Sequence, residues 1–297
     1  MKKTILVLEN NGNEIQWGEN NEIEKVRTYK DGTLLTKTIR RFDPLVGLSL
    51  NKDWIKSISD YELIVLPDAL ATNSLLSWIK SHAGKNQRLI LFCNNRLQTI
   101  RNVSVFKARD LGFEIWSYDK NDCLEHGFKH FNQFLNREFY RKSSLETEYD
   151  AVFVGAKKDR GELILRIKDK MDKTGLKTWF YVTDMDELPG NMCRDHKQIS
   201  YEQYVSIIGK SRAVVDIVSD TNYGLTWRPV EALFMKKKLI TNCSSISEMT
   251  LYCKDNVYII GSDDRDLKLF LSSDYTEIDD EIVSKYDVSG FIRTLIE

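Results

Sequence analysis

The sequence predicts an α/β protein with two parallel-sheet domains that face each other across a cleft, and three observations support this. The chain has 297 residues, which suits two domains of roughly 140 residues each. Short apolar runs alternate with amphipathic segments in both halves, as in sheets covered by helices. Hydrophobic residues make up 42% and charged residues 29% of the chain, as in globular proteins. We expect a first domain over residues 1–145, a second over 146–275 and a helical tail over 276–297.

The first half alternates predicted strands and helices. Residues 4–8 form a mostly apolar run that ends at Glu9, which predicts a strand followed by a turn. The next elements are expected in order as helix 53–58, strand 63–66, helix 73–83, strand 88–92, helix 105–111 and strand 113–117. Residues 13–45 are polar and mixed, residues 119–141 are polar and aromatic-rich, and no element is predicted in either.

The second half repeats the alternation more clearly. Residues 162–174 carry Leu163, Ile167 and Met171 in register, which predicts an amphipathic helix. The other elements are expected in order as strand 151–154, strand 177–182, helix 201–210, strand 213–219, a helix and a strand within 223–242, strand 257–260, and helices 266–271 and 288–296.

The most informative stretch is residues 223–242, where a glycine turn opens a helix that runs into an apolar strand. A helix N-terminus offers free N–H groups and partial positive charge, so it suits an anion. Gly224 lets the backbone approach that anion closely, and Pro229 suits the first helical turn. Arg228 adds a cation, and Glu231 is near enough to reach a sugar hydroxyl beside a bound phosphate. These are the parts of a nucleotide-sugar site.

A second glycine-flanked loop has the same character. Residues 155–161 follow a strand and precede a helix, and Gly155, Lys157 and Arg160 lie in this loop. The spacing is neither that of a P-loop nor that of a dinucleotide fingerprint. A pyrophosphate could nonetheless meet a helix N-terminus and cations here, at the carboxyl ends of parallel strands. The alternative is a solvated basic turn.

Other motifs have structural interpretations that compete with function. Arg228 and Glu231 are spaced i, i+3 and could form a salt bridge. Asp184-Met185-Asp186 resembles a metal-binding Asp-x-Asp pair, but a turn is the favoured interpretation. His126 and His130 are spaced i, i+4 without a clear third ligand, so no metal site is predicted.

Polar residues follow the predicted strands of the first half and would form the other wall of the cleft. They are Glu9, Asn10, Asn11, Asp68, Asn94, Asn95, Arg96 and Asp119. A base for an acceptor hydroxyl must lie within hydrogen-bond reach of it. Asp68 and Glu9 are the predicted catalytic residues.

Composition limits the partners and the compartment. The net charge is −1, so no global field attracts nucleic acid, and nucleic acid is not expected as a partner. The five cysteines include no C-x-x-C pair, which favours a reducing compartment. The apolar run at 4–8 is too short for a signal peptide. We expect a cytoplasmic protein, with peripheral contact at the inner face of the membrane left open.

The second half resembles the donor domain of GT-B glycosyltransferases, especially bacterial capsular, exopolysaccharide and lipopolysaccharide biosynthesis enzymes. The matching segments are 149–155 with its basic turn, 199–204 and 224–242; residues 116–122 also resemble the end of the first domain in these enzymes. The resemblance implies two Rossmann-like domains. It also implies sugar transfer from a nucleoside diphosphate sugar to the hydroxyl of a glycan or lipid-linked glycan, without a metal or other cofactor.

The same resemblance implies roles for individual residues. Gly224, Leu225 and Thr226 would offer backbone N–H groups to the donor phosphates, and Glu231 would bind the donor ribose. Lys157 and Arg160 would neutralise the pyrophosphate. Retaining relatives have a further glutamate where this chain has Tyr223, so retention and inversion both stay open. The alternatives are a nucleotide-sugar epimerase of the same architecture and a non-catalytic nucleotide-binding scaffold in polysaccharide assembly.

Overall fold

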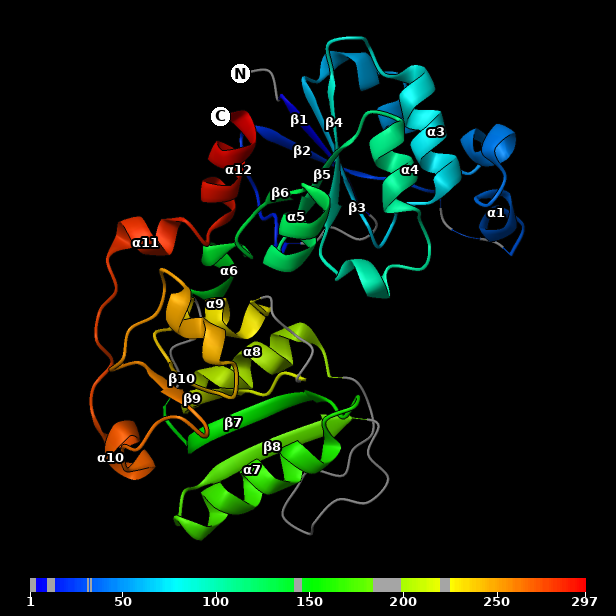
Figure 1. Ribbon diagram of the computed structural model, residues 1–297. Helices are drawn as coiled ribbons and strands as arrows, with labels where there is room; N and C mark the ends of the chain where they lie inside the picture. Colours follow the sequence, from blue (N-terminus) through cyan, green and yellow to red (C-terminus); the bar gives the residue numbers. More distant parts are fainter. Residues whose placement is uncertain are drawn as a thin grey trace. The chain divides into compact units, whose positions relative to one another are not determined.

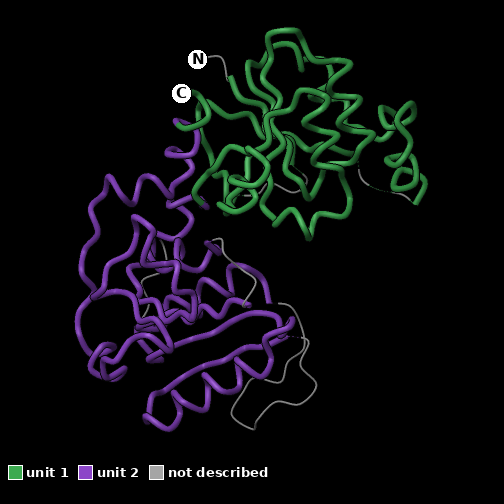
Figure 2. The backbone as a smooth tube through the Cα atoms, viewed as in Figure 1, with its two compact units in different colours: residues 1–132, 294–297 green, residues 133–293 purple. Residues whose placement is uncertain are grey.

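The chain folds into two compact α/β units, each built on a parallel sheet. The computed structural model describes residues 4–9, 14–30, 32, 34–141, 146–183, 199–219 and 225–297. Unit 1 comprises residues 1–132 with 294–297, and unit 2 comprises residues 133–293 (Figure 2). The predicted fold class of two parallel-sheet α/β domains is confirmed.

The units change over at residue 133, earlier in the chain than the expected domain boundary at 145. The reason lies in residues 133–141, which bond to the later part of the chain. Leu135 donates its N–H to the carbonyl of Tyr286 at 3.0 Å, and the N–H of Arg137 donates to Asp287 Oδ1 at 3.0 Å. These bonds also tie residues of the expected 276–297 tail into unit 2.

Unit 1 contains a six-stranded sheet in the order β2-β1-β3-β4-β5-β6, and all its pairings are parallel. Its strands are β1 (Ile5–Glu9), β2 (Ile23–Arg27), β3 (Leu63–Pro67), β4 (Arg88–Cys93), β5 (Glu114–Ser117) and β6 (Lys129–His130). Its helices are α1 (Leu34–Ile39), α2 (Lys52–Ile55), α3 (Asn73–His82), α4 (Val105–Asp110) and α5 (Lys120–His126), with the 3-10 turns η1 (Asp43–Leu48), η2 (Ile58–Asp60) and η3 (Leu97–Thr99).

The strands and helices predicted in the first half are all present, but strands β2 and β6, helices α1 and α5 and the 3-10 turns were not predicted. Strand β2 pairs only with β1 at the edge of the sheet, and only Ile23 of its residues is buried. An edge strand of this kind has no apolar run to reveal it. Helix α5 and strand β6 lie within the polar, aromatic-rich residues 119–141, although Asp119 caps α5 and Gly127 ends it in the left-handed conformation (φ 69°).

Unit 2 contains a five-stranded parallel sheet in the order β11-β10-β9-β7-β8. Its strands are β7 (Tyr149–Ala156), β8 (Thr178–Thr183), β9 (Ser211–Asp216), β10 (Lys238–Thr241) and β11 (Val257–Ile259). Its helices are α6 (Arg137–Tyr140), α7 (Gly161–Lys173), α8 (Tyr201–Gly209), α9 (Trp227–Phe234), α10 (Leu267–Ser272) and α11 (Asp280–Ser284), with η4 (Ser244–Glu248); α12 (Val288–Ile296) begins in this unit.

Helix α7 lies along β7 and β8, with α8 and α9 on the other side of the sheet (Figure 1). The buried stripe of α7 is Ile164, Ile167 and Met171. The predicted stripe began one residue earlier, at Leu163, which is only partly buried. Ile164 thus takes the buried position predicted for Leu163, and Leu163 lines a pocket instead.

Both sheets reverse their strand order once, between β1 and β3 in unit 1 and between β7 and β9 in unit 2. Loops leave the two strands of such a pair in opposite directions, which opens a crevice at their carboxyl ends. Ligands of open α/β sheets bind at this point. The ends of β7 and β9 are therefore where a site in unit 2 is expected.

Candidate functional site

Two arginines connect the carboxyl ends of β7 and β9. Arg228, in the first turn of α9, donates from Nη1 to Asp216 Oδ1 at 3.3 Å and from Nη2 to the carbonyl of Val154 at 2.5 Å. Arg160, which precedes α7, donates to the carbonyl of Ile217 and to that of Ala156, the latter at 3.3 Å. Each side chain thus connects a carbonyl of β7 to the carboxyl end of β9, at the point where the strand order reverses.

The two guanidinium groups leave excess positive charge at this point. Their Cζ atoms lie 5.6 Å (Arg160) and 5.4 Å (Arg228) from the ring centroid of Phe153. Across the described residues, Arg228 is ion-paired with Asp216, whereas no carboxylate lies within ion-pair distance of Arg160. The Nε atoms of both arginines are buried without a hydrogen-bond partner in that part of the chain. An anion that accepted from these groups would relieve the imbalance.

The pKa shifts of the cations agree with this picture. Burial lowers the pKa of Arg160, and the charge of Arg228 lowers it further. Burial likewise opposes the charge on Arg228, but nearby negative charge, including that of Asp216 and Glu231, outweighs it and raises its pKa. Arg160 is therefore the cation that lacks compensation in the free protein.

Asp216, which is only 1% exposed, accepts hydrogen bonds from three side chains of the site. Its Oδ1 accepts from Arg228 and from the Thr226 hydroxyl at 3.2 Å, and its Oδ2 accepts from the Thr241 hydroxyl at 3.4 Å. These contacts join the end of β9 to the start of α9 and to the end of β10. Because the Thr226 side chain bonds to Asp216, it makes no capping hydrogen bond to α9.

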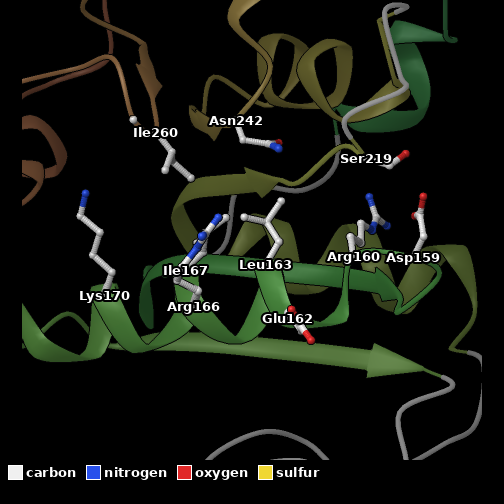
Figure 3. A pocket seen from close by; sticks show the side chains of 11 residues that line it. Asp159, Arg160, Glu162, Leu163, Arg166, Ile167, Lys170, Ser219, Asn242 and Ile260 are labelled. Atoms are coloured by element: carbon white, nitrogen blue, oxygen red, sulfur yellow. The ribbon is translucent and has the colours of Figure 1, made fainter.

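A pocket of about 830 Å³ opens beside Arg160. Helix α7 forms one wall, and the other comes from residues that follow β9, β10 and β11. The lining residues are Asp159, Arg160, Glu162, Leu163, Arg166, Ile167, Lys170, Ser219, Asn242, Ile260 and Gly261. Figure 3 shows Arg160 and Leu163 pointing toward Ser219 and Asn242. Helix α7 has no side-chain cap at its N-terminus, so its first N–H groups add to the positive field beside the pocket.

The pocket wall is fixed by Asn242. Its Oδ1 accepts from the N–H of Val218 at 2.8 Å, and its Nδ2 donates to the carbonyl of Val218 at 2.9 Å. This paired contact holds the chain after β9 against the chain after β10, beside the pocket.

Glu231 lies in a cluster of tyrosines instead of facing solvent. It is 1% exposed, its Oε1 accepts from the Tyr201 hydroxyl and its Oε2 from the Tyr204 hydroxyl. Tyr201 shares a further hydrogen bond with Tyr140, with 2.6 Å between the hydroxyl oxygens. A donor ribose could reach Glu231 only if a tyrosine hydroxyl gave way, so the ribose contact stays a prediction. No salt bridge joins Glu231 to Arg228 within the described residues.

The environment of Glu231 predicts a pH dependence of stability. Burial raises its pKa above the ordinary 4.5, although the hydrogen bonds from the two tyrosines and the charge of Arg228 oppose this. The folded protein therefore binds a proton more tightly than the unfolded chain, so stability from this group is lost as pH rises above 4.5. Relative to Glu231→Gln, the wild type should gain free energy of unfolding between pH 7.5 and pH 5 in urea titrations. A relative loss over that interval would contradict the assignment.

Gly155 at the end of β7 is close to both arginines. A Cβ at this position would lie 2.7 Å from Nη2 of Arg228 and 3.3 Å from Nη2 of Arg160. We expect Gly155→Ala to displace the Arg228 guanidinium and weaken anion binding about tenfold, the worth of one charged hydrogen bond. Gly84→Ala, where the nearest atom is 3.5 Å away on the Gln87 side chain, is the matched control. Equal binding of diphosphate by both variants, measured by calorimetry, would argue against this geometry.

The structure places the other predicted donor-site residues as follows. Lys157 lies in the loop before α7, and its side-chain carbons cover Gly161. Leu225 is buried and Thr226 is bonded to Asp216. Gly224 lies outside the described residues, as do Tyr223 and the Asp184–Asp186 pair.

Several of the polar residues predicted to follow the strands of unit 1 lie at the carboxyl edge of its sheet, whereas Asn10 and Asn11 lie outside the described residues. Asp68 is 1% exposed and accepts from the N–H of Asn94 at 3.1 Å and from Asn95 Nδ2 at 2.9 Å. Burial raises its pKa, although these amide hydrogen bonds oppose the shift. Arg96 pairs with the buried Asp119 at 3.0 Å. Glu9 ends β1 and is buried.

Two further expectations concern metals and membranes. Helix α5 ends at His126, and His130 belongs to β6, so these histidines do not share a helix face. No cluster of three metal-ligating side chains occurs among the described residues. In the part of the chain that the structure describes, no helix is both long and apolar enough to cross a bilayer.

The sequence does not reveal the buried partners of these side chains. Asp216, which pairs with Arg228, lies in a predicted strand with no role of its own, and Tyr201 and Tyr204, which donate to Glu231, lie in a segment singled out only for its resemblance. A single charge at the end of an apolar strand, with an arginine near the start of the next helix, is the signal that could have indicated the Asp216–Arg228 pair.

No protein-family model and no curated protein matches the sequence. Among solved structures, the chain is similar to an alpha-glucosyltransferase in complex with UDP and a 13-mer DNA containing a central A:G mismatch. The TM-score is 0.58 at 11% identity, and the match covers 99% of this chain and 98% of that one. A UDP-GlcNAc 2-epimerase from Methanocaldococcus jannaschii gives a TM-score of 0.47 at 12% identity, over 94% and 86% of the two chains. The first likeness establishes the fold alone, which is the GT-B fold with two Rossmann-like domains.

Proposed function

We propose that this protein is a glycosyltransferase that moves a sugar from a nucleoside diphosphate sugar to an acceptor hydroxyl. The observation that carries the proposal is Arg160, a partly buried cation without a carboxylate partner among the described residues, at the strand-order reversal of unit 2. Arg228 and the uncapped start of α7 add positive charge at the same point. Such a site favours a diphosphate.

In the proposed reaction, the positive charge of the two arginines acts on the leaving diphosphate. The acceptor oxygen attacks the anomeric carbon as the bond from that carbon to the diphosphate oxygen breaks. Negative charge then grows on the leaving diphosphate, where Arg160 and Arg228 stabilise it. The acceptor proton passes to a base, for which we propose Asp68, whose raised pKa suits that role, or Glu9. Because two arginines and a helix N-terminus supply the positive charge, the proposed reaction needs no metal.

The donor and acceptor belong to the same proposal. The similar alpha-glucosyltransferase structure holds UDP, so uridine diphosphate sugars are the first donors to test. We propose a glycan or lipid-linked glycan of bacterial surface polysaccharide biosynthesis as acceptor, with the enzyme at the cytoplasmic face of the membrane and no nucleic-acid substrate. The DNA in the similar structure makes a DNA acceptor the natural negative control.

A thermal-shift screen followed by turnover tests the proposal. The purified protein is heated with UDP, GDP, CMP, TDP and ADP, with Mg²⁺ or with EDTA. A nucleotide at a hundredfold excess over its dissociation constant adds about 2.7 kcal/mol of stability. Nucleotide release that depends on an added glycan acceptor, and persists in EDTA, supports the transferase. Conversion of the donor sugar alone would indicate an epimerase, and binding without turnover a scaffold.

A further inference from the structure

Unit 1 also has an exposed apolar segment that contains no strand of its sheet. Helix α1 and turn η1, residues 34–48, expose five large apolar side chains. They are Leu34 (83% exposed), Leu35 (68%), Phe42 (54%), Leu45 (44%) and Leu48 (62%). Elsewhere in the described chain, exposed large apolar residues are scattered singly. A concentration of this kind marks an interaction surface.

The segment is anchored to the core of unit 1 through turn η1 and the chain that follows it, whereas α1 itself buries no residue. Val46 and Leu50 are completely buried, and Gly47 packs against the indole of Trp78. The Arg40 guanidinium lies 3.9 Å from the ring centroid of the buried Tyr29. The five exposed apolar side chains therefore do not contribute to the core of unit 1.

The charge around these side chains is positive, although the whole chain carries −1. Lys37, Arg40 and Arg41 lie within residues 34–48, and Asp43 is the one acidic residue there. Lys107 Nζ lies 3.7 Å from Asp43 Oδ2 and offsets its charge. Lys30 adds a further cation, with its Nζ donating to the carbonyl of Leu48 at 2.9 Å.

We propose that residues 34–48 attach the protein to an anionic lipid bilayer. Apolar side chains inserted at the headgroup boundary and cations facing anionic headgroups are the two contributions that hold peripheral proteins to membranes. Duplex DNA would use the cations but would leave the leucines and Phe42 in water. The apolar side chains therefore favour a bilayer over a nucleic acid.

Flotation with lipid vesicles tests this inference and requires no sugar donor, so it stands or falls separately from the transferase reaction. The wild type should float with phosphatidylcholine–phosphatidylglycerol vesicles and much less with pure phosphatidylcholine. Replacing Leu35, Leu45 and Leu48 together by serine should lower the partition coefficient at least about tenfold, because less apolar area would be removed from water. Lys37→Gln with Arg41→Gln should lower it and reduce its salt dependence.

The control replaces leucines that are equally exposed but lie elsewhere, Leu124→Ser (85% exposed) and Leu269→Ser (72%), and should float like the wild type. If the triple variant is unstable, Leu34→Ser replaces it in the flotation assay, because that side chain is the most exposed of the five. This variant should also float less than the wild type. Wild type that stays with the unbound fraction, or leucine variants that float normally, would overturn the proposal. So would tighter binding to duplex DNA that depends on Lys37 and Arg41 but not on the leucines.

Discussion

Arg160→Gln should abolish most nucleotide binding while leaving the fold intact. The variant removes a cation that bonds only to carbonyl oxygens in the described chain, so a diphosphate would lose a charge-assisted hydrogen bond. That loss corresponds to about a 10- to 100-fold weaker affinity. Calorimetric titration with the nucleoside diphosphate that stabilises the wild type measures it.

The same variant should change the stability of the free protein only slightly, and this separates binding from stability. Burial and the neighbouring Arg228 both disfavour the charge of Arg160, so the neutral glutamine relieves repulsion as it gives up a hydrogen bond. We expect the free energy of unfolding to fall by less than about 1 kcal/mol. Arg166→Gln, further along α7 and exposed to the same pocket, is the control and should bind nearly normally. A larger loss of affinity in Arg166→Gln than in Arg160→Gln would move the anion site away from the strand ends.

Asp216→Ala, unlike Arg160→Gln, should cause a large loss of stability in the absence of ligand. The carboxylate is buried and offsets the charge of Arg228, and breaking a buried ion pair from one side costs about 3–5 kcal/mol. The hydroxyls of Thr226 and Thr241 would also lose their acceptor. Urea denaturation measures the change. Because Glu231 still provides negative charge near Arg228, we expect a value near the lower end of this range.

A surface ion pair provides the comparison for Asp216. Asp169 pairs with Lys173 at 2.6 Å on α7, and both side chains are mostly exposed. Asp169→Ala should cost less than about 1 kcal/mol, as exposed pairs do. If Asp216→Ala cost no more than Asp169→Ala, the arginines would be held by something other than Asp216.

The sequence predicts the alternating elements well because buried strands and amphipathic helices leave apolar patterns that survive without tertiary information. The pattern at 63–66 matches β3, and the pattern at 162–174 matches α7 within one residue. Strand β2 left no such pattern because an edge strand buries little. The order of strands in each sheet could not be predicted either, because hydrophobic periodicity does not indicate which strands become neighbours.

The candidate site could be predicted in part. Glycine-flanked loops with arginines pointed to the strand ends, and the structure brings Gly155, Arg160 and Arg228 together there. The environment of Glu231 could not be foreseen, because spacing shows that a glutamate lies on a helix but not that tyrosines from α8 occupy its oxygens. Burial of a charged group depends on long-range packing.

A crystal structure of the protein with the nucleoside diphosphate selected by the thermal screen tests the central claim most directly. The account predicts diphosphate oxygens within hydrogen-bond distance of Arg160, beside Arg228 and the first turn of α7, at the carboxyl ends of β7 and β9. A diphosphate bound elsewhere in the molecule, with the Arg160 side chain still directed at its carbonyl partners alone, would contradict it.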